Sequence, residues 1–355
     1  MQPFELGQTV ETLGMIVGAG TLAFIVALIL TPPFYQQLVK SHIGKQIRSN
    51  ALTGGKSKLY SALHAKKAGT PTMGGLLIWG TVLIIVIFSR FLSYLGVFDH
   101  SLLNRKETWI PLFTLVTFGA LGAVDDYLNV KGIGHTKGLS AKLKMLGLLI
   151  LSGASAWWFY AKLGFTHLNI PIPGIESIEI GWLSIPLFIL VIIATANAVN
   201  FTDGLDGLAS GLLIMAFAAF GIIAFFKGLL ILATLCVVII GALLAFLWFN
   251  VPPAKFYMGD TGSMALGATL GVIAMLTDQT LVLPIIGFVF VIEALSVIIQ
   301  LTSKKFFNRK VFKIAPLHHH YEQKGWKEFT IVMRFWIVGG IFAASGTILG
   351  LINIL

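Results

Sequence analysis

Long stretches without a charged side chain constrain this chain more than any other feature of its sequence. A transmembrane helix needs about 20 predominantly apolar residues to cross the hydrocarbon core of a bilayer. The pattern predicts an all-α polytopic integral membrane protein with about ten transmembrane helices, in a single transmembrane domain over residues 1–355. The stretches are residues 12–39, 68–89, 108–124, 145–161, 180–202, 207–226, 228–254, 261–277, 279–303 and 335–355, and only Glu293 interrupts the ninth.

The composition excludes a soluble protein. Only 11% of the residues are charged and 56% are hydrophobic, whereas a soluble globular domain carries about 25% charged residues. The single cysteine, Cys236, lies within an apolar stretch, so an intrachain disulfide and a cysteine metal cluster are ruled out. We expect its thiol to pack in the interior. The residues before the first stretch include Glu5 and Glu11 but no basic residue, which is not the pattern of a signal peptide.

The basic residues gather in alternate loops. Segments 40–67, 125–144 and 304–327 hold most of the Lys and Arg residues. Because Lys and Arg are enriched in cytoplasmic loops, this alternation predicts that both termini lie outside. A lipid bilayer, and no nucleic acid, then accounts for the net charge of +10. Between the fourth and fifth stretches, a Pro-Gly pair flanked by β-branched residues predicts a short external β-hairpin near residues 169–181.

Five aspartates lie at the predicted cytoplasmic ends of the stretches. Carboxylates close to hydrocarbon are costly and usually mark a functional site. Several together also repel one another, and a divalent cation relieves that repulsion. Oxygen ligands favour magnesium, manganese or calcium over zinc, and magnesium is commonly held by one or two carboxylates plus substrate phosphates. The pattern predicts magnesium-dependent phosphate chemistry at a membrane surface. The five residues are Asp125, Asp126, Asp203, Asp206 and Asp260.

Two further segments have side chains suited to phosphate or sugar. The segment from Lys66 to Gly75 has two lysines and paired glycines; its backbone amides could approach a phosphate, or its glycines could serve close helix packing. Three adjacent histidines, His318, His319 and His320, can donate hydrogen bonds to a diphosphate or a sugar and exchange protons near neutrality. Metal ligation and a solvated loop are the alternatives for these histidines.

Isolated polar residues complete the set of candidates. Glu293 and Gln300 are seven residues apart, which puts both on one face of a helix. They could form a buried polar pair, and Gln300, nearer the cytoplasmic end, could contact substrate. Asn250 and Tyr257 could supply a hydrogen bond and a stacking face to a planar base.

With these motifs the sequence resembles a known family, the polyprenyl-phosphate phosphosugar transferases. Within it, the sequence is most similar to the branch that handles phospho-MurNAc-pentapeptide in bacterial peptidoglycan synthesis. The resemblance covers the whole chain, and the triple histidine with Gly69–Gly75 favours this branch over relatives that carry N-acetylglucosamine phosphate. The segments that carry the resemblance are Asp125-Asp126, Asn197–Gly207, Met258–Gly262 and Pro316–Glu322.

The resemblance implies a reaction and its partners. Phospho-MurNAc-pentapeptide would pass from UDP-MurNAc-pentapeptide to undecaprenyl phosphate, giving lipid I and UMP, with Mg²⁺ as cofactor. The enzyme would lie in the bacterial inner membrane with its active site on the cytoplasmic face, and a homodimer is plausible. Attack on the diphosphate could be direct or could pass through an aspartyl-phosphate. The near alternative is a transferase that uses UDP-N-acetylglucosamine, and the distant one is a transporter.

The resemblance also implies the site residues, on cytoplasmic loops 40–71, 125–144, 197–207, 250–263 and 304–330. Asp125, Asp126, Asp260 and His318 are expected to be catalytic, with Asp260 as the metal ligand. Tyr257 stands where relatives carry Phe, and Lys142 competes with Lys137 for the lysine of the second loop. The expected substrate contacts are Lys67, Thr72, Lys137, Asn197, Asn200, Asp203, Asp206, Asn250, Tyr257, Ser263, Gln300, His319 and His320.

Overall fold

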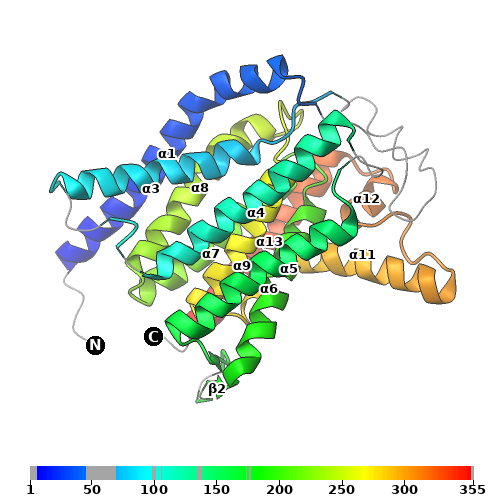
Figure 1. Ribbon diagram of the computed structural model, residues 1–355. Helices are drawn as coiled ribbons and strands as arrows, with labels where there is room; N and C mark the ends of the chain where they lie inside the picture. Colours follow the sequence, from blue (N-terminus) through cyan, green and yellow to red (C-terminus); the bar gives the residue numbers. More distant parts are fainter. Residues whose placement is uncertain are drawn as a thin grey trace.

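The protein is a bundle of long helices (Figure 1). The computed structural model describes residues 6–44, 69–97, 101–104, 106–133, 138–172, 174–175 and 177–352. Its longer helices are α1 (Leu6–Lys40), α3 (Gly75–Tyr94), α4 (Lys106–Lys131), α5 (Ala141–Trp158), α6 (Ser184–Thr202), α7 (Leu208–Phe226), α8 (Leu230–Asn250), α9 (Asp260–Leu276), α11 (Phe288–Phe307) and α13 (Glu328–Leu351), and two short helices are α10 (Leu283–Ile286) and α12 (Leu317–Glu322).

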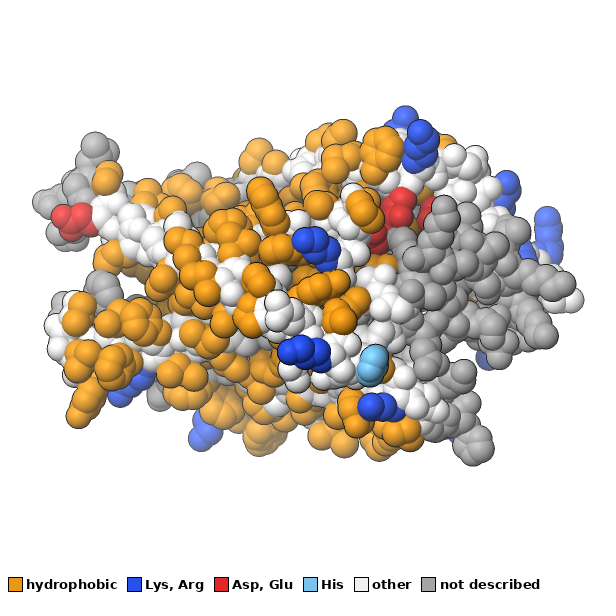
Figure 2. All heavy atoms as spheres, turned by 90° about the horizontal axis from the view of Figure 1, so that it is seen from above, with side chains coloured by type: hydrophobic (Ala, Val, Ile, Leu, Met, Phe, Trp, Pro, Cys, Tyr) orange, Lys and Arg blue, Asp and Glu red, His pale blue; other side chains and the backbone are white. Residues whose placement is uncertain are grey.

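Within the described residues, eight helices are long and apolar enough to cross a membrane. They are α1, α3, α4, α5, α6, α7, α8 and α13. Many large hydrophobic side chains are also exposed, and Figure 2 shows hydrophobic side chains spread over the described part of this face. The prediction of an all-α polytopic membrane protein is therefore confirmed.

The other two predicted spans coincide with shorter or broken helices. The eighth is α9, which has 17 residues. The ninth is not one helix, because a turn follows α9 and Gly287 separates α10 from α11. Pro284 lies in the first turn of α10, where its fixed φ suits a helix start.

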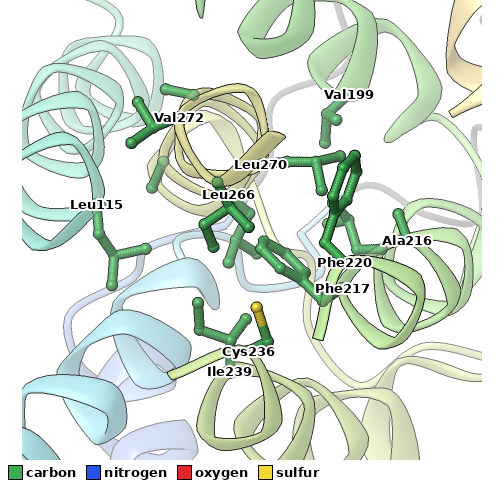
Figure 3. Packing of buried hydrophobic residues seen from close by; sticks show 14 of the residues in the cluster. Leu115, Val199, Ala216, Phe217, Phe220, Cys236, Ile239, Leu266, Leu270 and Val272 are labelled. Carbon is green, nitrogen blue, oxygen red and sulfur yellow. The ribbon is translucent and has the colours of Figure 1, made fainter. Parts of the chain in front are cut away.

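Helix α9 forms the centre of the bundle. Every residue from Thr261 to Leu276 is buried, and α9 packs against α3, α4, α6 and α7. Figure 3 shows its side chains Leu266 and Leu270 among residues of the surrounding helices. Cys236 on α8 is buried in this core, as predicted.

A small hairpin lies at the far end of α9. Strand β1 (His167–Leu168) pairs antiparallel with β2 (Ile178–Glu179), so the predicted hairpin is confirmed with its first strand slightly earlier. The Asn169 amide donates to the Asp278 carbonyl oxygen, 3.3 Å away, just after α9 ends. The Gln279 amide likewise donates to the carbonyl of Gly350 in α13. The hairpin and the end of α13 thus lie at the end of α9 opposite Asp260.

Candidate active site

The site begins where the carboxyl end of α4 meets the amino end of α9. The Asp126 carboxylate accepts hydrogen bonds from the backbone N–H of Asp260 (3.2 Å), the backbone N–H of Thr261 (3.0 Å) and the Thr261 hydroxyl (2.6 Å). The first N–H groups of a helix lack partners within the helix, and they carry partial positive charge. Asp126 therefore caps α9 from α4, and both of its carboxylate oxygens are engaged.

Asp125 and Asp260 share one cation, the ammonium group of Lys144. Lys144 Nζ lies 3.2 Å from Asp125 Oδ2 and forms a second ion pair with Asp260 Oδ2. Asp125 also accepts a hydrogen bond from the Leu139 backbone N–H at 2.6 Å. Since two carboxylates in a partly buried site repel each other, the positive charge of Lys144 offsets this repulsion and allows them to lie close together.

Asn200 on α6 completes the hydrogen bonding of Asp260. Its side-chain amide donates to Asp260 Oδ1 (2.7 Å) and to the Ser263 hydroxyl (2.9 Å). A Cβ built on Gly259 would lie 2.4 Å from Asp126 Oδ2 and 2.8 Å from the Thr72 hydroxyl, so Thr72 borders the same cluster. The structure thus brings together six predicted site residues: Thr72, Asp125, Asp126, Asn200, Asp260 and Ser263.

The carboxylates fit a cation with oxygen ligands. Asp125 and Asp260 already hold the lysine ammonium between them, and two carboxylates are what magnesium commonly takes from a protein when phosphates supply other ligands. In the described part of the chain, no group of three or more His, Cys, Asp or Glu side chains is arranged to hold a metal ion by itself. A metal here would therefore depend on substrate oxygens.

The turn after α6 is fixed by predicted residues that bond within the protein. Asp206 Oδ2 accepts a hydrogen bond from the Ala254 N–H at 3.0 Å. Asn250 accepts from the Gly207 N–H (3.0 Å) and donates to the Phe256 carbonyl (3.0 Å). These bonds tie the turn between α6 and α7 to the loop between α8 and α9.

Asn197 and Asp203 lie on either side of Asn200. The Asn197 amide donates to the Ile193 carbonyl one turn earlier in α6. Asp203 ends α6, and its backbone N–H donates to the Val199 carbonyl. Both residues belong to the helix end that carries Asn200 to the carboxylates.

The three histidines of α12 have three different partners. His318 is fully buried, and its Nδ1 lies 3.1 Å from Glu293 Oε2. His319 Nδ1 lies 2.6 Å from Glu322 Oε2. His320 Nδ1 accepts a hydrogen bond from the Lys313 backbone N–H. Burial, with Lys324 and Lys313 nearby, lowers the pKa of His320 below its usual value, which favours a neutral ring.

Gln300 has a structural use in this fold. Its carbonyl oxygen accepts hydrogen bonds from the backbone N–H groups of Val311 and Phe312, and its amide donates to the Phe312 carbonyl. Glu293 and Gln300 are both buried on α11, as the spacing predicts. Each binds a different part of the segment that follows α11.

The glycine-rich segment before α3 is used for packing. The Gly74 and Gly75 N–H groups donate to the carbonyls of Tyr257 and Met258, at 2.8 and 2.9 Å. A Cβ on Gly75 would lie 2.1 Å from Gly262 in α9, so close approach of α3 and α9 requires glycine. The Gly74 and Gly75 amides are therefore already bonded within the protein, and both glycines serve close packing, the alternative to phosphate binding.

Tyr257 lies half-buried in the loop before α9, and its own N–H donates to the Pro71 carbonyl at 2.8 Å. The predicted lysines Lys67 and Lys137 lie outside the described residues.

Sequence reasoning missed the place of Lys144 in the site and the partner of Glu293. From sequence alone, Lys144 is only one of the basic residues of a loop, although it lies in the first turn of an apolar helix, α5, which follows the helix that carries Asp125. A lysine one turn inside a span, with no acidic neighbour in its own helix, was the available signal. Glu293 was singled out as polar within a span, but its partner His318 could not be inferred from spacing.

Comparisons with known proteins agree on one family. Residues 108–278 match the family model described as glycosyl transferase family 4, and residues 67–78 match phospho-N-acetylmuramoyl-pentapeptide-transferase signature 1. A phospho-N-acetylmuramoyl-pentapeptide-transferase of Bacillus anthracis is 42% identical over 342 residues, which is 95% of this chain and 98% of the relative. The protein of the same name from Shouchella clausii is 43% identical over 333 residues, covering 93% of this chain and 95% of the relative.

Proposed function

This chain belongs to the phospho-N-acetylmuramoyl-pentapeptide-transferase family, and we propose on that basis the full reaction and the residues that carry it. The enzyme transfers phospho-MurNAc-pentapeptide from UDP-MurNAc-pentapeptide to undecaprenyl phosphate. The products are lipid I and UMP. This is the first membrane step of peptidoglycan synthesis.

The observation that carries this proposal is the cluster formed by Asp125, Asp260, Lys144 and Asn200. It gathers two carboxylates, a cation and an amide donor from four different helices. Phosphoryl transfer needs reactants held in place and charge neutralised, with little covalent chemistry from the protein. A cluster of this composition, at the end of an apolar helix bundle, suits a charged diphosphate and a lipid-borne acceptor.

In the reaction, a phosphate oxygen of undecaprenyl phosphate forms a new bond to the sugar-linked phosphorus of the donor. The bond from that phosphorus to the bridging oxygen breaks, and its electrons leave with UMP. Because the second pKa of a phosphate monoester is about 6, the acceptor is largely dianionic at pH 7. Its attacking oxygen therefore has little need of a general base to remove a proton.

We assign different roles to the two adjacent aspartates. Asp126 uses both oxygens to cap α9, so it holds the Asp260 end of that helix in place. Asp125 faces Lys144 and is the better placed of the two to order the incoming lipid phosphate or to act as a nucleophile. This assignment favours Asp125 as the reacting group of the pair.

Asp260, with Asp125 beside it, is the proposed holder of Mg²⁺. When bound, the ion would neutralise charge on the diphosphate and on the leaving UMP. Lys144, released from the carboxylates, would then be close enough to contact a phosphate oxygen. Asn200 keeps Asp260 oriented in either case through the 2.7 Å hydrogen bond.

The proposed location follows from the charge pattern. The helix ends that carry the aspartates adjoin the loops richest in Lys and Arg, which indicates the cytoplasmic side of the bacterial inner membrane. The donor would arrive from the cytoplasm, and the lipid acceptor from the bilayer around the bundle.

The test is UMP release by the purified protein in detergent, with undecaprenyl phosphate as acceptor. UDP-MurNAc-pentapeptide and UDP-N-acetylglucosamine are compared as donors, each with and without magnesium. Magnesium-dependent release with the muramoyl donor alone supports the proposal. Release with the other donor moves the chain to the N-acetylglucosamine branch, and no release from a folded protein overturns the reaction.

A further inference from the structure

An arginine lies on the lipid-facing side of the last span. Helix α13 buries Ile331 and Phe335 in the bundle. On another side of the helix, Arg334, Ile337 and Ile341 are exposed, and their spacing of three and four residues puts them on one helix face. Because α13 is long and apolar enough to cross a membrane, this face meets lipid. A charged side chain is costly there and usually has a partner or a function.

The guanidinium group of Arg334 rests on an indole ring. Its carbon Cζ lies 4.2 Å from the centroid of the Trp326 ring, which is within the range of a cation–π contact. Side chains on a helix tilt toward its amino end, so Arg334 reaches back past the start of α13 at Glu328. The side chain thereby carries its charge from the apolar level of the helix toward the membrane surface.

Trp326 is held by the segment between α12 and α13. Its ring lies against that of Tyr321 in α12, with the two centroids 4.6 Å apart. Its backbone N–H donates to the Tyr321 carbonyl at 3.2 Å. The ammonium group of Lys324 lies 5.6 Å from the centroid of the Tyr321 ring. Two neighbouring aromatic rings therefore carry two cations, Arg334 and Lys324.

No carboxylate in the described part of the chain forms an ion pair with either cation. The acidic residues nearest in sequence are engaged elsewhere. Glu322 binds His319, and Glu328 accepts a hydrogen bond from the Asp206 N–H at 2.8 Å. A ring contact stabilises a cation but leaves its charge and its N–H donors in place. The start of α13 is thus a positively charged surface beside lipid.

We propose that Arg334 and Lys324, held by Trp326 and Tyr321, bind the phosphate of an anionic phospholipid from the surrounding bilayer. The planar fork of an arginine matches the oxygens of a phosphate, and indole rings favour the level of the lipid headgroups. The basic loop before α13 indicates the cytoplasmic leaflet, whose anionic lipids attract Lys and Arg.

This lipid site is separate from the carboxylate cluster. Helix α13 packs chiefly against α7 and α10, whereas the cluster is built on α4, α5, α6 and α9. An acceptor phosphate has to reach the cluster, which favours a resident phospholipid at Arg334. Because the site joins Tyr321 of α12 to Arg334 of α13, a bound phosphate would hold these two helices together.

The first test measures lipid binding by native mass spectrometry, with the full chain in a neutral detergent. Dioleoylphosphatidylglycerol is the anionic probe, and dioleoylphosphatidylcholine, which has no net charge, is the comparison. We expect the natural protein to bind the anionic lipid more tightly. Arg334→Gln should raise the Kd for phosphatidylglycerol about tenfold, as for loss of a hydrogen bond to a charged group. The Kd for phosphatidylcholine should not change.

Further variants separate the arginine site from general charge. Trp326→Leu keeps every charge but removes the ring under Arg334, and should also weaken phosphatidylglycerol binding. If Trp326→Leu fails to fold, Arg334→Lys replaces it, because lysine keeps the charge but not the planar fork, and the same direction of change is expected. Lys310→Gln, an exposed position in the same basic loop, is the matched control and should leave the Kd unchanged.

Equal losses in Arg334→Gln and Lys310→Gln would show a diffuse effect of charge and would overturn the inference, as would an unchanged Kd in Arg334→Gln. In a competition arm, undecaprenyl phosphate at the concentration of phosphatidylglycerol should leave the bound phospholipid in place. Displacement that is lost in Arg334→Gln would assign the site to the acceptor and overturn the proposed ligand. These outcomes do not depend on the transfer reaction.

Discussion

The Thr261 hydroxyl, in the first turn of α9, donates a 2.6 Å hydrogen bond to Asp126 Oδ2 near the end of α4. This contact joins α4 to α9, although Asp126 and Asp260 are 134 residues apart in the sequence. It makes Asp126 the cap of α9, whereas the neighbouring Asp125 faces Lys144.

The division of roles between Asp125 and Asp126 is testable by replacing each with Asn. Asp126→Asn gives up a charged acceptor at a helix N-terminus, which typically costs about 0.5–2 kcal/mol. We expect a lower Tm and lower activity together. Asp125→Asn removes one of two repelling carboxylates, so activity should fall while Tm holds or rises. Thermal unfolding in detergent and UMP release measure the two effects, and an equal fall in Tm for both variants would contradict the assignment.

Lys144→Met tests whether the lysine balances the carboxylates. Removing one partner of a fully buried ion pair costs about 3–5 kcal/mol, and the loss here should be smaller because the lysine side chain is 20% exposed. We expect Tm to fall, and added magnesium to recover part of the loss by taking the place of the ammonium. Lys142→Met, an exposed position in the same first turn of α5, is the control. A magnesium response no larger than that of the natural protein would contradict a shared cation position.

Asn250→Leu separates a structural from a base-binding role. The substitution leaves the Gly207 N–H and the Phe256 carbonyl without partners, and each unsatisfied buried group costs about 1–3 kcal/mol. Tm should therefore drop clearly. An unchanged Tm with a raised KM for the donor would show that Asn250 acts on the substrate only.

We expect His320 in α12 to make the stability of the folded protein sensitive to acid. The lowered pKa of His320, caused by burial and then by Lys324 and Lys313, means that the folded state binds this proton less tightly than the unfolded state. Its contribution to stability is present above pH of about 6.5 and is lost as the pH falls below it. Tm should fall between pH 7.5 and 5.5 by more in the natural protein than in His320→Gln. Equal slopes would show that other groups set the acid response.

The helices, and the placement of Asp125, Asp126 and Asp260 at one end of the bundle, could be predicted from sequence because both depend on local features. Apolar stretches mark the spans, and the side to which Asp125, Asp126 and Asp260 belong follows from counting those spans. The pairing of Lys144 with Asp125 and Asp260 could not be predicted, since it depends on how α5 is rotated against α4 and α9.

The contact between Glu293 and His318 could not be predicted either, because it depends on the path of the segment after α11. For Gly74 and Gly75, the sequence allowed both phosphate binding and packing, and only the position of the Tyr257 carbonyl decides between them. Contacts between helices depend on the whole packing arrangement, which no short motif contains.

The central claim is that the carboxylate cluster around Asp260 carries the transfer, and UMP release by Asp260→Asn tests it most directly. Asp278→Asn, at the opposite end of α9 beside the hairpin, is the matched control. The account predicts that Asp260→Asn loses activity by about 100-fold or more, in the range seen when a charge-stabilising group is removed, while Asp278→Asn keeps its turnover. Turnover by Asp260→Asn within about twofold of the natural protein, at the same magnesium concentration, would contradict the account.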